Sequence, residues 1–143
     1  MRRNLLVVLL GLAFLLVLTW AGSVLVDSIP HPVTAPVQTA QAGPYQITLQ
    51  VNPNPPSVTQ PATLTVQILT NSSPQPLTNA HVTLESNMLS MDMGTDSTTA
   101  HPQSDGSYLA HVQFPMNGSW QVKVIVAMPG QQPANAVFEI TAQ

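Results

Sequence analysis

The fold is decided first by residues 45–51, which read Tyr-Gln-Ile-Thr-Leu-Gln-Val. Apolar and polar side chains alternate along this stretch. Successive side chains of a β-strand point to opposite faces, so a period of two predicts a strand with one buried face. The same alternation recurs at residues 64–68, 82–84, 108–114, 120–126 and 136–140. The sequence therefore predicts six clear strands, and a seventh is expected near residues 95–100.

The spacing of these segments indicates how the strands pack. They follow one another at intervals of roughly ten to twenty residues over about 100 residues, which is typical of an immunoglobulin-like domain. Residues 115–118 read Pro-Met-Asn-Gly, and Asn-Gly between two strands is a strong hairpin signal. We expect an all-β fold, an immunoglobulin-like antiparallel β-sandwich of about seven strands, preceded by one N-terminal transmembrane helix. Its core is expected to contain Tyr45, Phe114, Trp120 and Phe138.

The predicted transmembrane helix is residues 5–26, a run of 22 residues without a charged side chain. At about 1.5 Å per residue, a helix of this length reaches roughly 33 Å, enough to cross the core of a bilayer. Arg2 and Arg3 precede the run and Asp27 follows it. Basic residues stay on the cytoplasmic side, so this arrangement predicts a single-pass protein of the cell membrane whose C-terminal part is extracytoplasmic.

A cleaved signal peptide is the alternative for the same segment. Its apolar region would be residues 5–18, with Thr19 and Ala21 as the small residues before the cut. The apolar run resumes at Val24, where a signal peptide usually turns polar. An uncleaved signal-anchor is therefore favoured, and both alternatives place the rest of the chain outside the cytoplasm.

Three parts of the chain follow from these patterns. Residues 1–27 are the membrane anchor or signal segment. Residues 28–43 contain three prolines and no apolar periodicity, which predicts a proline-rich linker that acts as a semi-extended spacer. Residues 44–143 are the predicted β-sandwich domain.

Composition excludes several classes of function. From Asp27 onward the chain carries six acidic residues and one basic residue, Lys123. A nucleic-acid binder needs clustered Lys and Arg, so that class is excluded. The chain has no cysteine, which excludes disulfides and thiolate metal sites. No nucleophile elbow, zinc-protease motif, phosphate loop or dinucleotide fingerprint occurs in the sequence, and we do not expect an enzyme.

The methionines carry the most information about function. Residues 88–93 read Met-Leu-Ser-Met-Asp-Met and are followed by Gly94. Thioether sulfur is a soft ligand that suits Cu(I), and Ser90 and Asp92 interrupt the apolar pattern expected of a core strand. This methionine-rich loop is therefore a candidate copper site. The alternative is packing, because methionine fills irregular gaps in cores.

Topology decides which other side chains could join the loop. If residues 95–100 form a strand, the loop and the turn at Met116 fall at the same end of the sandwich, and His101 lies at the opposite end. If that strand is absent, His101 can fold back toward the methionines. The candidate metal ligands are therefore Met88, Met91, Met93, Met116 and His101.

Three motifs resemble the YtkA-like domain family. They are Met-x-x-Met-x-Met-Gly at residues 88–94, Gly-Ser-Tyr at residues 106–108 and Phe-Pro-Met-Asn-Gly-Ser-Trp at residues 114–120. The resemblance extends from about residue 45 to residue 140, and it implies a small extracytoplasmic β-sandwich behind one membrane anchor. Such domains are also similar in part to the FixH-type proteins of cytochrome oxidase assembly.

The resemblance also implies a site and a function. Met88, Met91, Met93 and Met116 match the family positions that point to copper ligation, whereas the glycines and aromatic residues of the motifs match structural positions. The family loop often carries histidine, and its absence between Met88 and Met93 favours Cu(I). We expect a membrane-tethered domain that binds copper for delivery or oxidase assembly, with a copper enzyme or membrane complex as its partner. The alternative is an immunoglobulin-like interaction module without metal, acting as an accessory subunit of a membrane complex.

Overall fold

The computed structural model describes residues 13–15 and 33–143. The chain divides into two compact units, Met1–Pro30 and His31–Gln143. Residues 13–15 are helical. Within the described residues, no helix combines the length and the apolar character needed to cross a membrane. The predicted membrane segment at residues 5–26 and the start of the predicted linker lie, apart from residues 13–15, outside the described residues.

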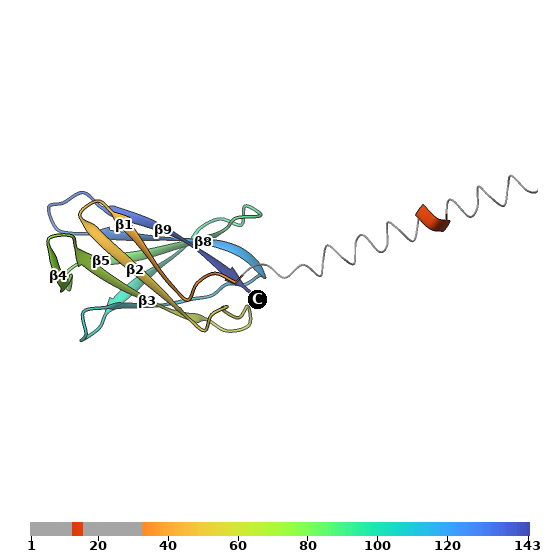
Figure 1. Cartoon of the computed structure of the whole chain (residues 1–143), viewed down its shortest axis with the longest axis horizontal. Coiled ribbons are helices and arrows are strands. Elements are labelled where there is room, and N and C mark those ends of the chain that lie inside the picture. The colour runs from red at the N-terminus through yellow and green to blue at the C-terminus, as the bar shows by residue number, and fades with distance from the viewer. Residues whose placement is uncertain (1–12, 16–32) are drawn as a thin grey trace, which may run out of the picture. The chain divides into compact units, whose positions relative to one another are not determined.

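Residues 33–143 form nine antiparallel strands (Figure 1). In chain order they are β1 (Val37–Ala42), β2 (Tyr45–Asn52), β3 (Ala62–Thr70), β4 (Ser73–Pro76), β5 (His81–Met88), β6 (Asp96–Pro102), β7 (Tyr108–Val112), β8 (Gly118–Ala127) and β9 (Ala134–Ala142). The prediction of an all-β antiparallel fold is confirmed. The expected strand near residues 95–100 is β6, and β1 and β4 are additional to those expected.

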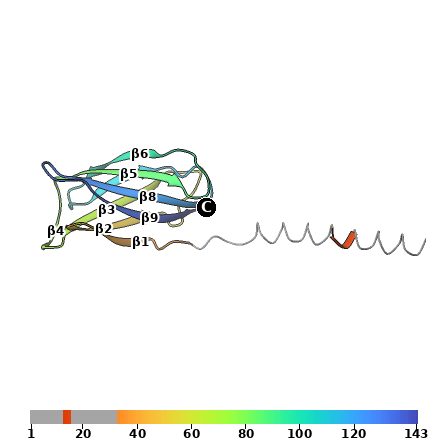
Figure 2. The same ribbon diagram turned by 90° about the horizontal axis from the view of Figure 1, so that it is seen from above.

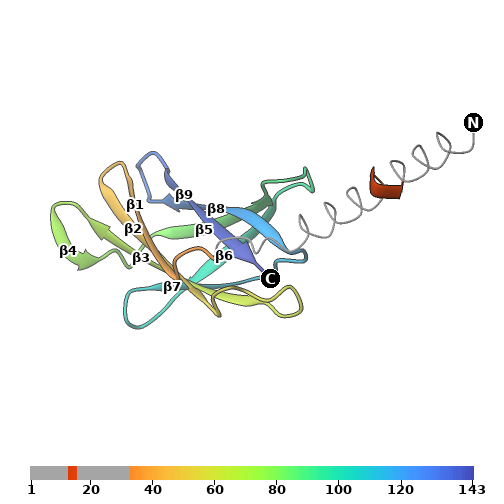
Figure 3. The same ribbon diagram turned by 45° about the vertical axis from the view of Figure 1, so that its right-hand side comes forward.

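The strands form two facing layers, β1-β2-β3-β7 with β4 on the edge of β3, and β6-β5-β8-β9 (Figure 2). Strand β6 connects them, because its residues 96–100 pair with β5 whereas His101 and Pro102 pair with β7 (Figure 3). Without β1 and β4, the orders β2-β3-β7-β6 and β9-β8-β5 follow those of the strands ABED and GFC in constant-type immunoglobulin domains.

The core lies between the layers and consists of the alternating inward side chains. Ile47 and Leu49 of β2 and Val122 and Val124 of β8 are fully buried. The four aromatic residues predicted to be in the core are all buried: Tyr45, Phe114, Trp120 and Phe138. The rings of Phe114 and Trp120 meet edge to face, with 5.5 Å between centroids and 67° between planes.

The prediction that residues 28–43 are a spacer is wrong for residues 37–42. These residues form β1, which pairs with β2 from Val37↔Gln50 to Ala42↔Tyr45. The Gln38 side chain also donates a hydrogen bond to the Glu139 carbonyl of β9, at 2.7 Å. This strand could not be recognised in the sequence because its inward positions are glutamine and alanine rather than large apolar residues. Backbone pairing with β2 holds it in place.

The predicted hairpin at residues 115–118 is also wrong. Strand β7 pairs with β3 and β6, whereas β8 pairs with β5 and β9, so residues 113–117 cross from one layer to the other. Phe114, expected at the end of a strand, lies within this connection and is fully buried. Asn117-Gly118 therefore begins a strand after a crossover.

The Gly-Ser-Tyr motif has a structural role, as the resemblance implied. Gly106 has a φ of 83°, and a Cβ there would lie 2.8 Å from the Cβ of Pro76. The Tyr108 hydroxyl donates to the Leu77 carbonyl at 2.8 Å and accepts from the Ala80 amide at 3.0 Å. The motif thus fixes the connection between β4 and β5.

Candidate functional site

The loop predicted to bind metal lies at one end of the sandwich, next to the connection that carries Met116. Strand β5 ends at Met88, which is paired with Trp120 near the start of β8. The Leu89 amide donates a hydrogen bond to the Ser119 carbonyl at 2.9 Å, which ties the loop to β8. The loop between β5 and β6 lies at the end of the domain marked C (Figures 1 and 3). We call residues 88–95 and 113–117 together the methionine end.

Exposure divides the four methionines into two kinds. The exposed fractions of Met91, Met93 and Met116 are 50%, 49% and 38%, whereas Met88 is only 7% exposed. Met88 is therefore part of the core, as the packing alternative predicts. The other three do not fill the core, because about half or a third of their surface faces solvent.

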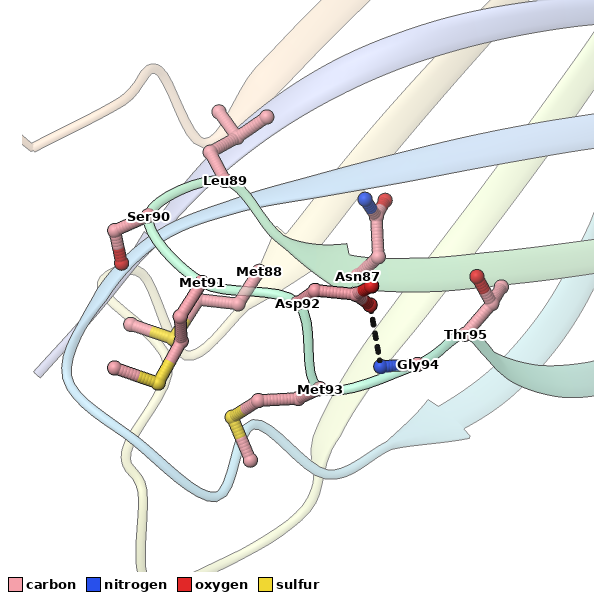
Figure 4. A pocket seen from close by; sticks show the side chains of 9 residues that line it. All are labelled: Asn87, Met88, Leu89, Ser90, Met91, Asp92, Met93, Gly94 and Thr95. Carbon is pink, nitrogen blue, oxygen red and sulfur yellow. Dashed lines mark hydrogen bonds between the residues drawn. The ribbon is translucent and has the colours of Figure 1, made fainter.

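An open depression of about 380 Å³ is lined by residues 87–95. The thioethers of Met88, Met91 and Met93 lie on the same side of the loop (Figure 4). Leu89, which was not singled out from the sequence, is 50% exposed at the same end. The site is thus a shallow surface of thioethers and one aliphatic side chain, and it has no enclosed cavity.

Local hydrogen bonds hold the loop and the connection in place. The Asp92 carboxylate accepts a hydrogen bond from the Gly94 amide at 3.1 Å, and Gly94 has a φ of 84°, which favours glycine. Across the end, the Trp120 indole N–H donates to the Met116 carbonyl at 3.0 Å. Asp92 therefore has a turn-forming role, and Trp120 positions the backbone that carries Met116.

The Met88 side chain also restricts which residue can occupy position 118 beside it. A Cβ at Gly118 would lie 2.9 Å from the Met88 methyl group, so the glycine leaves room for this side chain. The close approach of Met88 to the start of β8 explains its burial and accounts for the glycine of the third motif.

His101 is not part of the methionine end. It is exposed, and it pairs with Leu109 near the opposite end of β6. It lies five positions after Asp96, the first residue of β6, which is roughly 17 Å along a strand. The outcome is the one expected when residues 95–100 form a strand, and the structure does not bring His101 beside the methionines. Over the described parts of the chain, no group of three or more His, Cys, Asp or Glu side chains could hold a metal ion.

Asp105 lies at the opposite end, in the loop between β6 and β7. Its carboxylate accepts hydrogen bonds from the Ser107 hydroxyl at 2.7 Å and the Ser107 amide at 3.0 Å, and these hold the pKa of Asp105 below its usual value. It borders a groove of about 170 Å³ lined by the polar side chains Thr48, Gln50, Thr65, Gln67 and Ser107. No second acidic residue lines this groove.

We expect Ser107→Ala to raise the pKa of Asp105 toward its usual value, because the strongest hydrogen bond to the carboxylate is lost. A lowered pKa in the folded state contributes stability above the unfolded-state pKa, and this contribution is lost as pH falls through the folded-state pKa. The variant should therefore lose less stability on acidification than the parent. NMR titration of the Asp105 side chain tests this. An unchanged pKa would contradict it, and Ser104→Ala is the matched control.

The comparisons with known proteins agree with the resemblance drawn from the motifs. No curated protein matches the chain. The family model described as YtkA-like matches residues 39–125, from within β1 to within β8. This range includes all of the methionine end and the Gly-Ser-Tyr motif. Because the match spans more than half of the sequence, the chain belongs to the YtkA-like family.

Proposed function

We propose that this chain is a membrane-tethered, extracytoplasmic domain that binds copper at the methionine end, with Met91, Met93 and Met116 as ligands. The observation that carries the proposal is the exposure of three thioethers at one end of an otherwise well-packed sandwich. Core packing explains Met88 and leaves the other three without a structural role.

The donor set favours Cu(I). Thioether sulfur is soft, and soft ligands select Cu(I) among the metals available to proteins. Neither histidine nor cysteine lies within residues 88–95 or 113–117 to favour Cu(II) or zinc. Met88 lines the same depression and could join only after its flexible side chain leaves the core, so we place it outside the resting ligand set.

The exposure of the thioethers and the predicted position beside a membrane support a role in copper transfer rather than catalysis. Exposed thioethers bind weakly enough to exchange metal, as a delivery protein requires. The apolar run at residues 5–26 would tether the domain on the outer side of the membrane. We infer delivery of copper to a membrane-bound copper enzyme, or assistance in the assembly of an oxidase, and no catalytic activity of its own.

The test is a Cu(I) competition titration of residues 33–143 against a chromophoric chelator, without oxygen. This range is used because the unit has its own core and includes β1. We expect binding of one Cu(I) per chain. The control replaces Met88, Met91, Met93 and Met116 with leucine, which keeps apolar contact but cannot ligate, and it should not bind.

Absence of binding by the folded parent would refute the copper proposal. The exposed Leu89 and methionines would then favour the second candidate, a metal-free interaction module within a membrane complex, because flexible methionine surfaces adapt to partner proteins. Capture of a membrane complex by the parent and by the leucine control alike would support that function.

A further inference from the structure

The chain enters the domain at the methionine end. The Thr34 carbonyl accepts a hydrogen bond from the Asn54 side chain at 2.8 Å, and the Thr34 hydroxyl accepts one from the Thr141 amide at 3.2 Å. Thr141 is paired with Ser119, whose carbonyl accepts from the Leu89 amide. The contacts from Thr34 to Thr141, from Thr141 to Ser119 and from Ser119 to Leu89 each cross between neighbouring strands, a step of about 4.8 Å. Thr34 therefore lies roughly 15 Å from the loop that begins at Leu89.

The exposed apolar side chains are concentrated at this same end. Among residues 33–143, seven large apolar residues are exposed, and only Val137 lies away from the methionine end or the start of the domain. The other six are Val33, Val37, Leu89, Met91, Met93 and Met116. At the opposite end, the β8–β9 connection at residues 128–133 reads Met-Pro-Gly-Gln-Gln-Pro, and its one large apolar residue, Met128, is partly buried against the core.

The length of chain before Thr34 limits which end can approach a membrane. From Val26, the last residue of the apolar run, to Thr34 is eight residues, which span at most about 28 Å when fully extended. Strand β8 has ten residues, so the far end of the sandwich lies roughly 30 Å beyond the methionine end. A domain anchored by residues 5–26 therefore keeps its methionine end near the bilayer.

The charges at this end indicate what kind of surface it fits. Asp92 is the one charged residue within residues 88–95 and 113–117, and Lys123 lies within β8, paired with Glu85 at 3.2 Å. Anionic headgroups attract basic clusters, and the methionine end has none. Contact with lipid would therefore be made by apolar side chains. Because a tether keeps the domain at a high local concentration beside the membrane, even a weak contact of this kind holds the domain against the lipid.

We propose that the methionine end is the membrane-facing end of the domain, and that its apolar side chains rest on the lipid interface of the bilayer that holds residues 5–26. This inference rests on the membrane tether of the proposed function and is independent of copper binding. If both hold, copper would be exchanged at the bilayer surface, with an acceptor embedded in the membrane.

The test uses fluorescent labels on the full chain in phosphatidylcholine vesicles that contain lipids with a nitroxide headgroup. The chain has no cysteine, so Ser90→Cys in the loop and Gln132→Cys in the β8–β9 connection each provide one labelling site. We expect quenching at position 90 to be several-fold stronger than at position 132. Equal quenching, or stronger quenching at position 132, would overturn the orientation.

A second variant tests whether the apolar side chains make the contact. Leu89→Ser, Met91→Ser and Met93→Ser together, in the Ser90→Cys chain, should reduce quenching toward the level at position 132. Unchanged quenching would overturn the proposed lipid contact. Release of the chain by alkaline carbonate would refute the tether, and with it this inference, whereas the copper titration uses residues 33–143 and would be unaffected.

Discussion

Trp120→Ala is expected to lower the free energy of unfolding of residues 33–143 by about 3–5 kcal/mol, the usual cost of removing a large aromatic side chain from a core. Trp120 is 4% exposed, and its ring meets Phe114 edge to face. On neighbouring strands it is paired with Met88 and Ile140. A cavity here would therefore affect β5, β9 and the connection that carries Phe114 together.

This loss is large compared with the stability of a small domain, which is typically about 5–15 kcal/mol. The variant also removes the indole N–H that donates to the Met116 carbonyl, so the 113–117 connection loses its support. Trp120→Phe keeps an apolar ring without the donor and should cost less. The difference in unfolding free energy between the alanine and phenylalanine variants would thus show how much of the loss comes from packing of the ring and how much from the hydrogen bond.

Urea unfolding followed by circular dichroism measures the effect, since Trp120 is the one tryptophan of residues 33–143 and its fluorescence is lost in the variants. Gln121→Ala is the matched control, because this neighbouring side chain points away from the core and is partly exposed. It should change stability by no more than about 0.5 kcal/mol. A loss below about 1 kcal/mol for Trp120→Ala would contradict the central position given to this ring.

The strands that could be predicted from the sequence are those with a large apolar residue at every second position. β2, β3 and β8 follow this rule, and their inward side chains are buried as the alternation requires. β1 could not be found in this way, since Gln38, Ala40 and Ala42 supply its inward positions and pairing with β2 holds it.

Pairing between distant strands was the second feature that local patterns could not provide. Asn117-Gly118 has the composition of a hairpin turn, yet β7 and β8 belong to different layers. Local sequence indicates where the chain turns, but the partner of each strand depends on which faces must be buried together. The position of the loop beside Met116 was nevertheless predicted, because it required only that residues 95–100 form a strand.

The ligands predicted for the candidate site were four methionines and His101, and the structure separates the methionines by burial. Met88 differs because it is the last residue of β5 and is paired with Trp120, a register that the sequence does not reveal. Met91 and Met93 follow the end of that strand and have no neighbouring strand to cover them. Whether a methionine near the end of a strand is buried or exposed therefore depends on where the strand pairing stops, and a shift of one or two residues changes the outcome.

This separation leads to the second large effect. Met91→Leu with Met93→Leu is expected to weaken Cu(I) binding by about a hundredfold or more, since loss even of residues that only support metal ligands costs about 10–100-fold. The unfolding free energy should remain nearly unchanged, because both side chains are about half exposed and leucine has a similar volume. Competition titration and urea unfolding of the same preparation measure the two quantities.

Two single variants show whether the effect depends on thioether ligation. Met128→Leu replaces a half-buried methionine that packs against the core beyond the far end of β8, and it should leave Cu(I) affinity unchanged. Met88→Leu should change it only slightly, because this side chain is 7% exposed and its methyl group lies against Gly118. If Met88→Leu instead abolished binding while Met91→Leu with Met93→Leu did not, copper would bind inside the edge of the core, and exposure would be the wrong guide to the ligands.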